Sequence, residues 1–192
     1  MLELFYATFR IHTRSGELAQ VVAQDTLILQ RRQWKDNGQC VVFVNGCFDL
    51  LHPGHIRLLE QARSHGDILV VGVQSDASHA SAQDLATAFD GASAKSVKKT
   101  PGTVTPGAER AEILAALAAV DYVVEFDGPS PNALIARLSP DILVKGAPPQ
   151  TSPAELADDR LAESRGAKIV RILLEPGYST TSLIERITQA SA

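Results

Sequence analysis

The residues best able to do chemistry in this chain form one segment, NGCFDLLHPGH, at positions 45–55. His52 and His55 are three residues apart, so on a helix they share a face and can point at one spot. Pro53 suits the first turn of a helix, and Gly54 removes a side chain from the helix start. Two imidazoles beside the positive end of a helix favour an anion. The segment therefore predicts a phosphate-binding site.

Other interpretations of the segment are weaker. A glycine such as Gly46 can simply close a turn, Asp49 can be a local capping residue, and a single histidine is more often structural than catalytic. The histidine pair could also bind a metal ion, but it lacks a third ligand at a fixed spacing. The segment follows an apolar strand and opens a helix, which is where α/β proteins bind phosphates. The phosphate interpretation is favoured.

Short apolar runs alternate with helical patterns along the chain. We expect strands at 41–44, 68–73, 123–125, 142–145 and 168–174, and helices at 56–65, 108–119, 132–138, 153–164 and 180–188. Continuous apolar strands between helices indicate a parallel sheet with helices on both faces. The right-handed crossover rule then gives an α/β fold with a doubly wound, Rossmann-like sheet. Ligands of such sheets bind beyond the carboxyl ends of the strands, near the switch point.

The chain has 192 residues, which is about one domain. We expect a core domain at 41–192, preceded by an N-terminal extension at 1–40 that packs on the core or leads into it. Residues 1–26 are ambiguous and suggest a strand and a turn around Ser15-Gly16. The segment 77–105 is rich in Ala, Ser, Thr and Gly, and we expect a long, mobile loop there.

Composition excludes several classes of protein. The net charge of −4 argues against a general nucleic-acid coat, and no apolar run approaches the roughly 20 residues of a membrane span. The N-terminus lacks the charge order of a secretory signal, and Cys40 and Cys47 form neither a CxxC metal motif nor a disulfide framework. We therefore expect a cytoplasmic protein. The chain also lacks a GxGxxG motif after a strand and a Walker A motif.

The segment at 45–55 resembles the HxGH signature of the cytidylyltransferase-like nucleotidyltransferase superfamily. The resemblance runs from about residue 41 to residue 187. It includes VGVQSD at 71–76, the stretch from Thr105-Pro106 to Arg110, LVKG at 143–146 and STT at 179–181. Within the superfamily, AVDYVVEF at 119–126 and PDILVKG at 140–146 look most like the adenylyltransferase domain of ADP-heptose synthase, the D-glycero-β-D-manno-heptose 1-phosphate adenylyltransferase.

This resemblance implies a Rossmann-like nucleotidyltransferase of the HUP type. A sugar 1-phosphate attacks the α-phosphorus of a nucleoside triphosphate, and pyrophosphate leaves. ATP is the expected nucleotide, and Mg²⁺ accompanies it without a protein carboxylate cage. The implied catalytic residues are His52, His55 and Lys145. The implied nucleotide- and phosphate-binding residues are Asn45, Gly46, Cys47, Phe48, Asp49, Gly54, Lys98, Lys99, Arg110, Ser179, Thr180 and Thr181. Which of Lys95, Lys98 and Lys99 reaches the triphosphate stays open.

Two other functions stay open. One is a cytidylyltransferase that makes a CDP-alcohol from glycerol-3-phosphate or ethanolamine phosphate, although LEPGY at 174–178 replaces the Arg-Thr pair usual in the glycerol-3-phosphate enzymes. The other is a nucleotide-binding regulator without turnover. Residues 147–150 read APPQ where relatives carry an acidic and an aromatic residue, which affects the acceptor side.

The resemblance also implies partners. The expected ligands are the triphosphate and the sugar 1-phosphate, with no nucleic acid and no membrane. Relatives are often homodimers, although the sequence has no interface signal of its own. The sugar-kinase domain that often precedes this domain is absent from the sequence, so we expect a separate sugar kinase.

Overall fold

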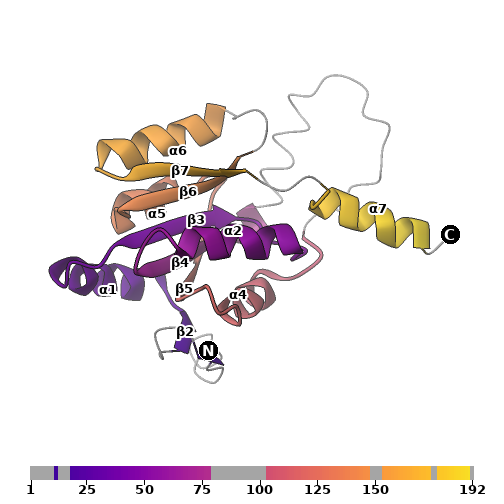
Figure 1. Ribbon diagram of the computed structural model, residues 1–192, viewed down its shortest axis with the longest axis horizontal. Helices are drawn as coiled ribbons and strands as arrows, with labels where there is room; N and C mark the ends of the chain where they lie inside the picture. The colour runs from indigo at the N-terminus through magenta and orange to yellow at the C-terminus, as the bar shows by residue number, and fades with distance from the viewer. Residues whose placement is uncertain (1–10, 13–17, 79–102, 148–152, 174–176, 191–192) are drawn as a thin grey trace.

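The computed structural model describes residues 11–12, 18–78, 103–147, 153–173 and 177–190. In this part of the chain, seven strands form one sheet in the order β1-β2-β5-β4-β3-β6-β7 (Figure 1). The strands are β1 (Ile11–His12), β2 (Leu18–Val21), β3 (Val41–Gly46), β4 (Ile68–Gln74), β5 (Tyr122–Phe126), β6 (Ile142–Ala147) and β7 (Lys168–Leu173). β1 pairs with β2 in the antiparallel direction, and β2 to β7 run parallel to one another.

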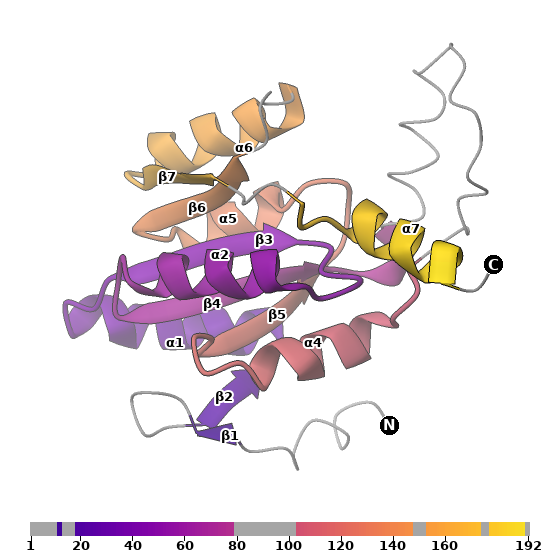
Figure 2. The ribbon, with the colours of Figure 1, turned by 45° about the vertical axis from the view of Figure 1, so that its right-hand side comes forward.

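Helices cover both faces of the sheet. The helices α2 (Pro53–Arg63) and α4 (Gly107–Ala115) pack on one face, and α1 (Gln24–Asp36), α5 (Asn132–Leu138) and α6 (Pro153–Ser164) pack on the other. α7 (Thr180–Ala190) lies apart from both layers, at the end of the sheet toward which the parallel strands run (Figures 1 and 2). None of the described helices combines the length and the apolar character that crossing a membrane requires.

The apolar strands explain the two layers. Successive residues of a strand point to opposite faces. In β3, Val42 and Val44 therefore join the core beneath α2 and α4, while Val41 and Phe43 join the core beneath α1 and α5. All four are buried, as expected for a strand covered on both sides. The predicted α/β fold with a parallel, doubly wound sheet is confirmed.

The strand order creates a switch point beside β3. From β3 the chain moves to β4 and β5 on one side, and then returns to the other side of β3 to form β6 and β7. Such a reversal leaves a crevice at the carboxyl ends of the two strands that flank it, here β3 and β6. Residues 45–55 begin at the end of β3, so the predicted phosphate segment lies at this crevice.

The helix α1 has no counterpart among the elements expected from the sequence. Its core face consists of Leu27, Arg31 and Trp34, which are spaced like one face of a helix. The middle residue is an arginine, so the apolar period is broken and the stretch reads as polar. The expected strand in residues 1–26 corresponds to β1 and β2, and the turn expected at Ser15-Gly16 lies outside the described residues.

Most other boundaries agree within three residues. The exception is the helix expected at 108–119, which is wrong in its last turn because α4 ends at Ala115. Leu117 and Ala119 still pack against the core, so their apolar character does not require a helical backbone. Of the loop expected at 77–105, the segment 79–102 lies outside the described residues.

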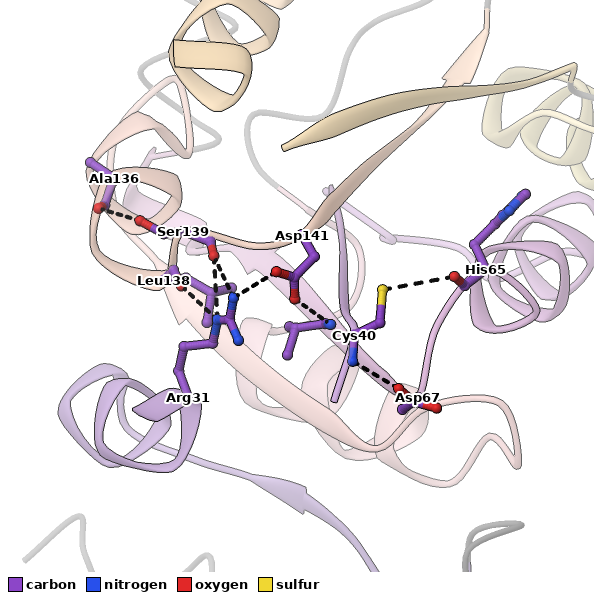
Figure 3. A network of polar contacts seen from close by, with 9 residues as sticks. Arg31, Cys40, His65, Asp67, Ala136, Leu138, Ser139 and Asp141 are labelled. Atoms are coloured by element: carbon purple, nitrogen blue, oxygen red, sulfur yellow. Dashed lines mark hydrogen bonds and ion pairs between the residues drawn. The ribbon is translucent and has the colours of Figure 1, made fainter. Parts of the chain in front are cut away.

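A buried arginine ties α1 to the sheet (Figure 3). The Arg31 guanidinium donates to the Ser139 carbonyl oxygen at the end of α5 and to Asp141 Oδ1, both at 3.0 Å. Asp141 Oδ2 in turn accepts a hydrogen bond of 2.7 Å from the amide of Val41, the first residue of β3. This network joins α1, α5 and β3 at the end of the sheet opposite the crevice.

We predict that Arg31→Met lowers the free energy of unfolding by about 2 kcal/mol. The substitution leaves carbonyl oxygens at the end of α5 and the Asp141 carboxylate with one donor fewer. The matched control is Arg137→Met, because Arg137 forms a more exposed ion pair with Asp25 and should contribute about 0.5 kcal/mol. Urea denaturation of both variants measures the difference, and equal losses would contradict this role of Arg31.

Candidate active site

The candidate site is built around two stacked histidines. His52 is the extended residue that precedes α2, with φ −141°, and Pro53 occupies the first turn. The imidazole rings of His52 and His55 lie with their centroids 3.7 Å apart and their planes at 18°. The Phe48 ring meets His55 edge-on at 5.3 Å, from a backbone with φ +53° that non-glycine residues rarely adopt. The loop after β3 and the first turn of α2 thus hold both histidines in one place.

Both histidines are electrically neutral at pH 7. Burial lowers the pKa of His52, and burial together with the nearby His52 lowers the pKa of His55 to about 4. The Nδ1 atoms of both rings are buried without a hydrogen-bond partner, and so is the Oδ1 atom of Asn45. Buried polar atoms normally have partners, so an unpartnered group calls for an explanation such as a missing ligand. Among the described residues, three of the seven such side-chain atoms fall within residues 45–55.

The start of α7 lies close to the start of α2. A Cβ atom on Gly54 would be 3.0 Å from His52 Nδ1 and 3.0 Å from the Cβ atom of Tyr178. A side chain at position 54 would force these groups apart by a few tenths of an ångström, so the glycine permits their close approach. Arg57 lies over the Tyr178 ring, 5.0 Å from its centroid, which adds a cation–π contact between α2 and the segment before α7.

The predicted hydroxyl residues lie at the beginning of α7. Ser179 Oγ accepts a hydrogen bond of 3.0 Å from the Ser182 amide, so Ser179 caps the helix as expected. Thr180 is half-buried, and the side chain of Thr181 lies outside the described residues. A phosphate contact by these three residues stays a prediction.

Arg110 is placed differently from its predicted role. Its side chain is fully buried, and the guanidinium donates to the Cys47 carbonyl oxygen at 2.5 Å and to the Thr105 carbonyl oxygen at 3.0 Å. It also forms an ion pair of 2.6 Å with Asp76. Arg110 thus joins the loop after β3, the end of β4 and the start of α4. In this arrangement it holds the site together from beneath, and contact with a phosphate stays a prediction.

Two aspartates complete this support. Asp49 Oδ1 accepts a hydrogen bond of 2.8 Å from the Thr105 amide, and Asp76 Oδ2 accepts one of 2.9 Å from the Gly107 amide. Burial raises the pKa of Asp76, but the hydrogen bonds from Gly107, Thr103 and Arg110 outweigh burial and lower it overall.

Among the described residues, no group of three or more His, Cys, Asp or Glu side chains could hold a metal ion.

Cys47 lies in the same loop and is half-buried. Burial raises the pKa of its thiol above the usual 9.0, so the thiolate is scarce at pH 7.

Cys40 precedes β3 and Cys47 follows it, so the strand separates them by about 23 Å at 3.3 Å per residue. The two cysteines are therefore too far apart for a disulfide.

Lys145 lies on the other side of the sheet from the histidines. In β6, Val144 faces the core beneath α2 and Leu143 faces the core beneath α5 and α6, so Lys145 shares the α6 face. The ammonium group is buried and forms an ion pair of 2.8 Å with Asp158 on α6. Contact with a substrate stays a prediction.

The structure thus brings together most of the predicted site residues. The residues around the histidine pair are Gly46, Cys47, Phe48, Asp49, His52, Gly54 and His55, with Arg110 beneath them. Asn45 lies at the end of β3 on the other face of the sheet. The basic segment with Lys95, Lys98 and Lys99 lies outside the described residues.

Sequence reasoning missed three residues of this region. Asp76 lies two residues after the end of the apolar strand β4, and a carboxylate at that position was an available signal. Asp158 lies in the middle of a helix and Tyr178 before one, and neither position carries a signal that a single sequence could show.

Comparisons with known proteins agree with this geometry. Residues 43–90 match the family model described as cytidylyltransferase-like. The chain is 42% identical over 171 residues to the bifunctional protein HldE of Hyphomonas neptunium. The aligned region covers 88% of this chain and 31% of that protein. It is 43% identical over 167 residues to the bifunctional protein HldE of Syntrophotalea carbinolica, and the aligned region covers 85% of this chain and 29% of that protein. The chain spans about a third of the length of the curated relatives it matches.

Solved structures show the same architecture. The lipopolysaccharide core biosynthesis protein from Thermoplasma volcanium is 27% identical, with a TM-score of 0.55, and covers 72% of this chain and 99% of its own. Pantoate-β-alanine ligase from Francisella tularensis, at 16% identity and a TM-score of 0.54, covers 88% of this chain and 73% of its own and shows the fold alone. The resemblance to cytidylyltransferase-like proteins is confirmed, and the comparisons support a nucleotidyltransferase.

We predict that Arg110→Lys lowers the free energy of unfolding by about 2–4 kcal/mol. A lysine keeps the charge but cannot donate at once to Cys47, Thr105 and Asp76 from one planar group. Chemical denaturation measures this loss. If Arg110 acted only as a phosphate contact, the variant would keep wild-type stability and change substrate affinity alone.

We also predict that lowering the pH from 7 to 5 destabilises the ligand-free protein, partly through His55. Its pKa falls from the usual 6.5 to about 4 on folding, so the unfolded chain binds more protons in this pH range and gains stability relative to the folded state. In His55→Gln the decrease in unfolding free energy between pH 7 and pH 5 should be smaller. Urea titrations at the two pH values test this, and an equal decrease in both proteins would refute it.

Proposed function

We propose that this chain, whose sequence and fold are cytidylyltransferase-like, is a nucleotidyltransferase that transfers AMP from ATP to a sugar 1-phosphate such as D-glycero-D-manno-heptose 1-phosphate. The products are pyrophosphate and a nucleotide-activated sugar. The observation that carries the proposal is the pair of stacked, neutral histidines with unpartnered Nδ1 atoms, located where α2 begins beside the switch point. An anion at this position gains hydrogen bonds that the protein alone does not supply.

The chemistry needs positioning more than acid–base catalysis. An oxygen of the sugar phosphate attacks the α-phosphorus of the triphosphate, and the bond from that phosphorus to the bridging oxygen of the β-phosphate breaks. Because the attacking phosphate is already an anion, no general base is required. His52 and His55 donate hydrogen bonds to the α-phosphate, and the dipole of α2 adds positive potential. Binding both substrates in line supplies the rest of the rate enhancement.

Mg²⁺ enters this proposal with the triphosphate, as part of the substrate. Asp49 and Asp76, two described carboxylates of the site, already accept hydrogen bonds, both from backbone amides and Asp76 also from Arg110. They are therefore poorly suited to a cage around the ion, which fits coordination by phosphate oxygens and water.

The choice of ATP and a heptose phosphate rests on the resemblance to the adenylyltransferase domain of ADP-heptose synthase. The similarity to bifunctional HldE proteins and to a lipopolysaccharide core biosynthesis protein supports a sugar as the acceptor. A homodimer supplied by a separate sugar kinase is part of the same proposal and rests on the resemblance alone. A cytoplasmic location is also proposed, and it rests on the cysteine usage of the sequence.

The proposal predicts pyrophosphate release from purified protein with Mg²⁺, ATP and a sugar 1-phosphate. A panel of ATP, CTP and GTP against heptose, hexose and glycerol phosphates, read by a coupled pyrophosphate assay, identifies both substrates. Release only with CTP would replace the adenylyltransferase assignment by a cytidylyltransferase. Absence of release with every pair would leave a nucleotide-binding regulator.

In the same assay, His55→Ala should lower kcat by about two orders of magnitude or more, because the α-phosphate loses a donor in the transition state. The control is His65→Ala, an exposed histidine just before β4 begins, at the end of the sheet opposite the crevice, and this variant should keep wild-type turnover. An unchanged rate in His55→Ala would remove this residue from the mechanism.

A further inference from the structure

We propose that Asp158 on α6 is a positioning residue for Lys145, and that this buried pair presents the lysine ammonium to a phosphate oxygen of a substrate. The inference rests on the proposed function and deepens it. It adds a second region of the site, on the α6 face of the sheet, to the histidine region on the α2 face.

The pair is short and almost completely buried. Lys145 Nζ lies 2.8 Å from Asp158 Oδ2, and the two side chains are 8% and 6% exposed. Burying an ammonium group is costly without a carboxylate beside it, so the ion pair with Asp158 stabilises the buried side chain of Lys145. One hydrogen bond to Asp158 uses one of the three N–H groups of the lysine.

Asp158 is itself held in place from a second side. Its Oδ1 atom accepts a hydrogen bond of 2.6 Å from Ser130 Oγ, in the loop that follows β5. Ser130 Oγ also accepts the Asn132 amide at 3.2 Å, at the start of α5. The carboxylate therefore cannot turn away from Lys145 without breaking a second hydrogen bond, which fixes the direction of the ammonium group.

The surroundings of Lys145 contain polar groups without partners. The pairing of β3 with β6 ends with Val44 opposite Val144, so Asn45 and Lys145 are the next residues of the two strands and lie on the same face of the sheet. The Oδ1 atom of Asn45 is buried and unpartnered, and so is the Oδ1 atom of Asn132. An ion pair that only locked α6 to the sheet would not explain these acceptors. A phosphorylated ligand with hydroxyl groups would meet both the cation and the acceptors.

The neighbouring ion pair provides a matched comparison. Asp159, the next residue of α6, pairs with Arg171 on β7, and Arg171 lies in register beside Lys145. β7 is the edge strand of the sheet, one strand further from the switch point, and the Arg171 side chain is 39% exposed. The same helix thus carries one pair beside the crevice and one away from it.

The test compares two double variants, K145M/D158L and R171M/D159L. Replacing a buried ion pair by apolar residues of similar size often preserves stability, so both proteins should fold with melting temperatures near that of the wild type. We expect K145M/D158L to weaken binding of ATP·Mg²⁺ or of the sugar 1-phosphate by about tenfold or more in calorimetric titrations. The control R171M/D159L should stay within about threefold of the wild type.

The titrations are run separately with the nucleotide and with the sugar phosphate, so they identify which phosphate Lys145 meets. A folded K145M/D158L that binds both ligands like the wild type would overturn the proposal and leave a purely structural pair. If this variant does not fold, Ser130→Ala takes its place, and an unchanged affinity for both ligands would overturn the proposal equally.

Binding and turnover separate this inference from the proposed function. A wild-type protein that binds ATP but releases no pyrophosphate with any acceptor contradicts the proposed transfer, while weaker binding in K145M/D158L still supports the Lys145 contact. A wild-type protein that binds neither ATP nor any sugar phosphate contradicts both.

Discussion

The ion pair between the fully buried Arg110 and the half-exposed Asp76 is the interaction on which the crevice end of the fold depends. One guanidinium reaches the carbonyl oxygens of Cys47 and Thr105 as well as the carboxylate of Asp76. These groups belong to the loop after β3, the approach to α4 and the end of β4. Parallel strands leave such loops without a ladder of their own, so their backbone polar groups need side-chain partners. Arg110 supplies them, and the stacked histidines rest on a loop that it fixes.

The second constraint is the alternation of strand faces. Neighbouring residues of a buried strand point to opposite layers. The position of a residue along its strand therefore decides which face it occupies, and two residues close in the sequence can lie on opposite faces. His52 and His55 belong to the layer of α2, whereas Asn45 and Lys145 belong to the layer of α6. The two layers meet at the carboxyl ends of β3 and β6, where the strand order reverses and ligands of such sheets bind. A ligand that spans two phosphorylated groups can therefore use both faces at once.

The sequence predicts those parts of the protein that local patterns determine. Apolar runs located the five core strands, and the HPGH spacing located the start of α2. The prediction failed where a charged residue occupies a core position. Arg31 lies on the core face of α1 because the Asp141 carboxylate and the Ser139 carbonyl oxygen at the end of α5 bind its guanidinium. The same holds for Asp158, whose partner Lys145 is 13 residues away. Pairing between distant elements has no local pattern, so neither the helix α1 nor the support of the site could be read from spacing.

The charges of the site follow from these pairings. Arg110 and Lys145 are cations near the crevice, yet each already faces an aspartate, and the two histidines are neutral because burial lowers their pKa. These cations and the two histidines therefore add little net positive charge to the described part of the site before a ligand binds. A bound triphosphate would raise the pKa of both histidines, because a nearby negative charge favours the protonated imidazole. The buried, neutral histidine pair thus avoids the cost of a permanent buried charge and gains charge only when its ligand is present.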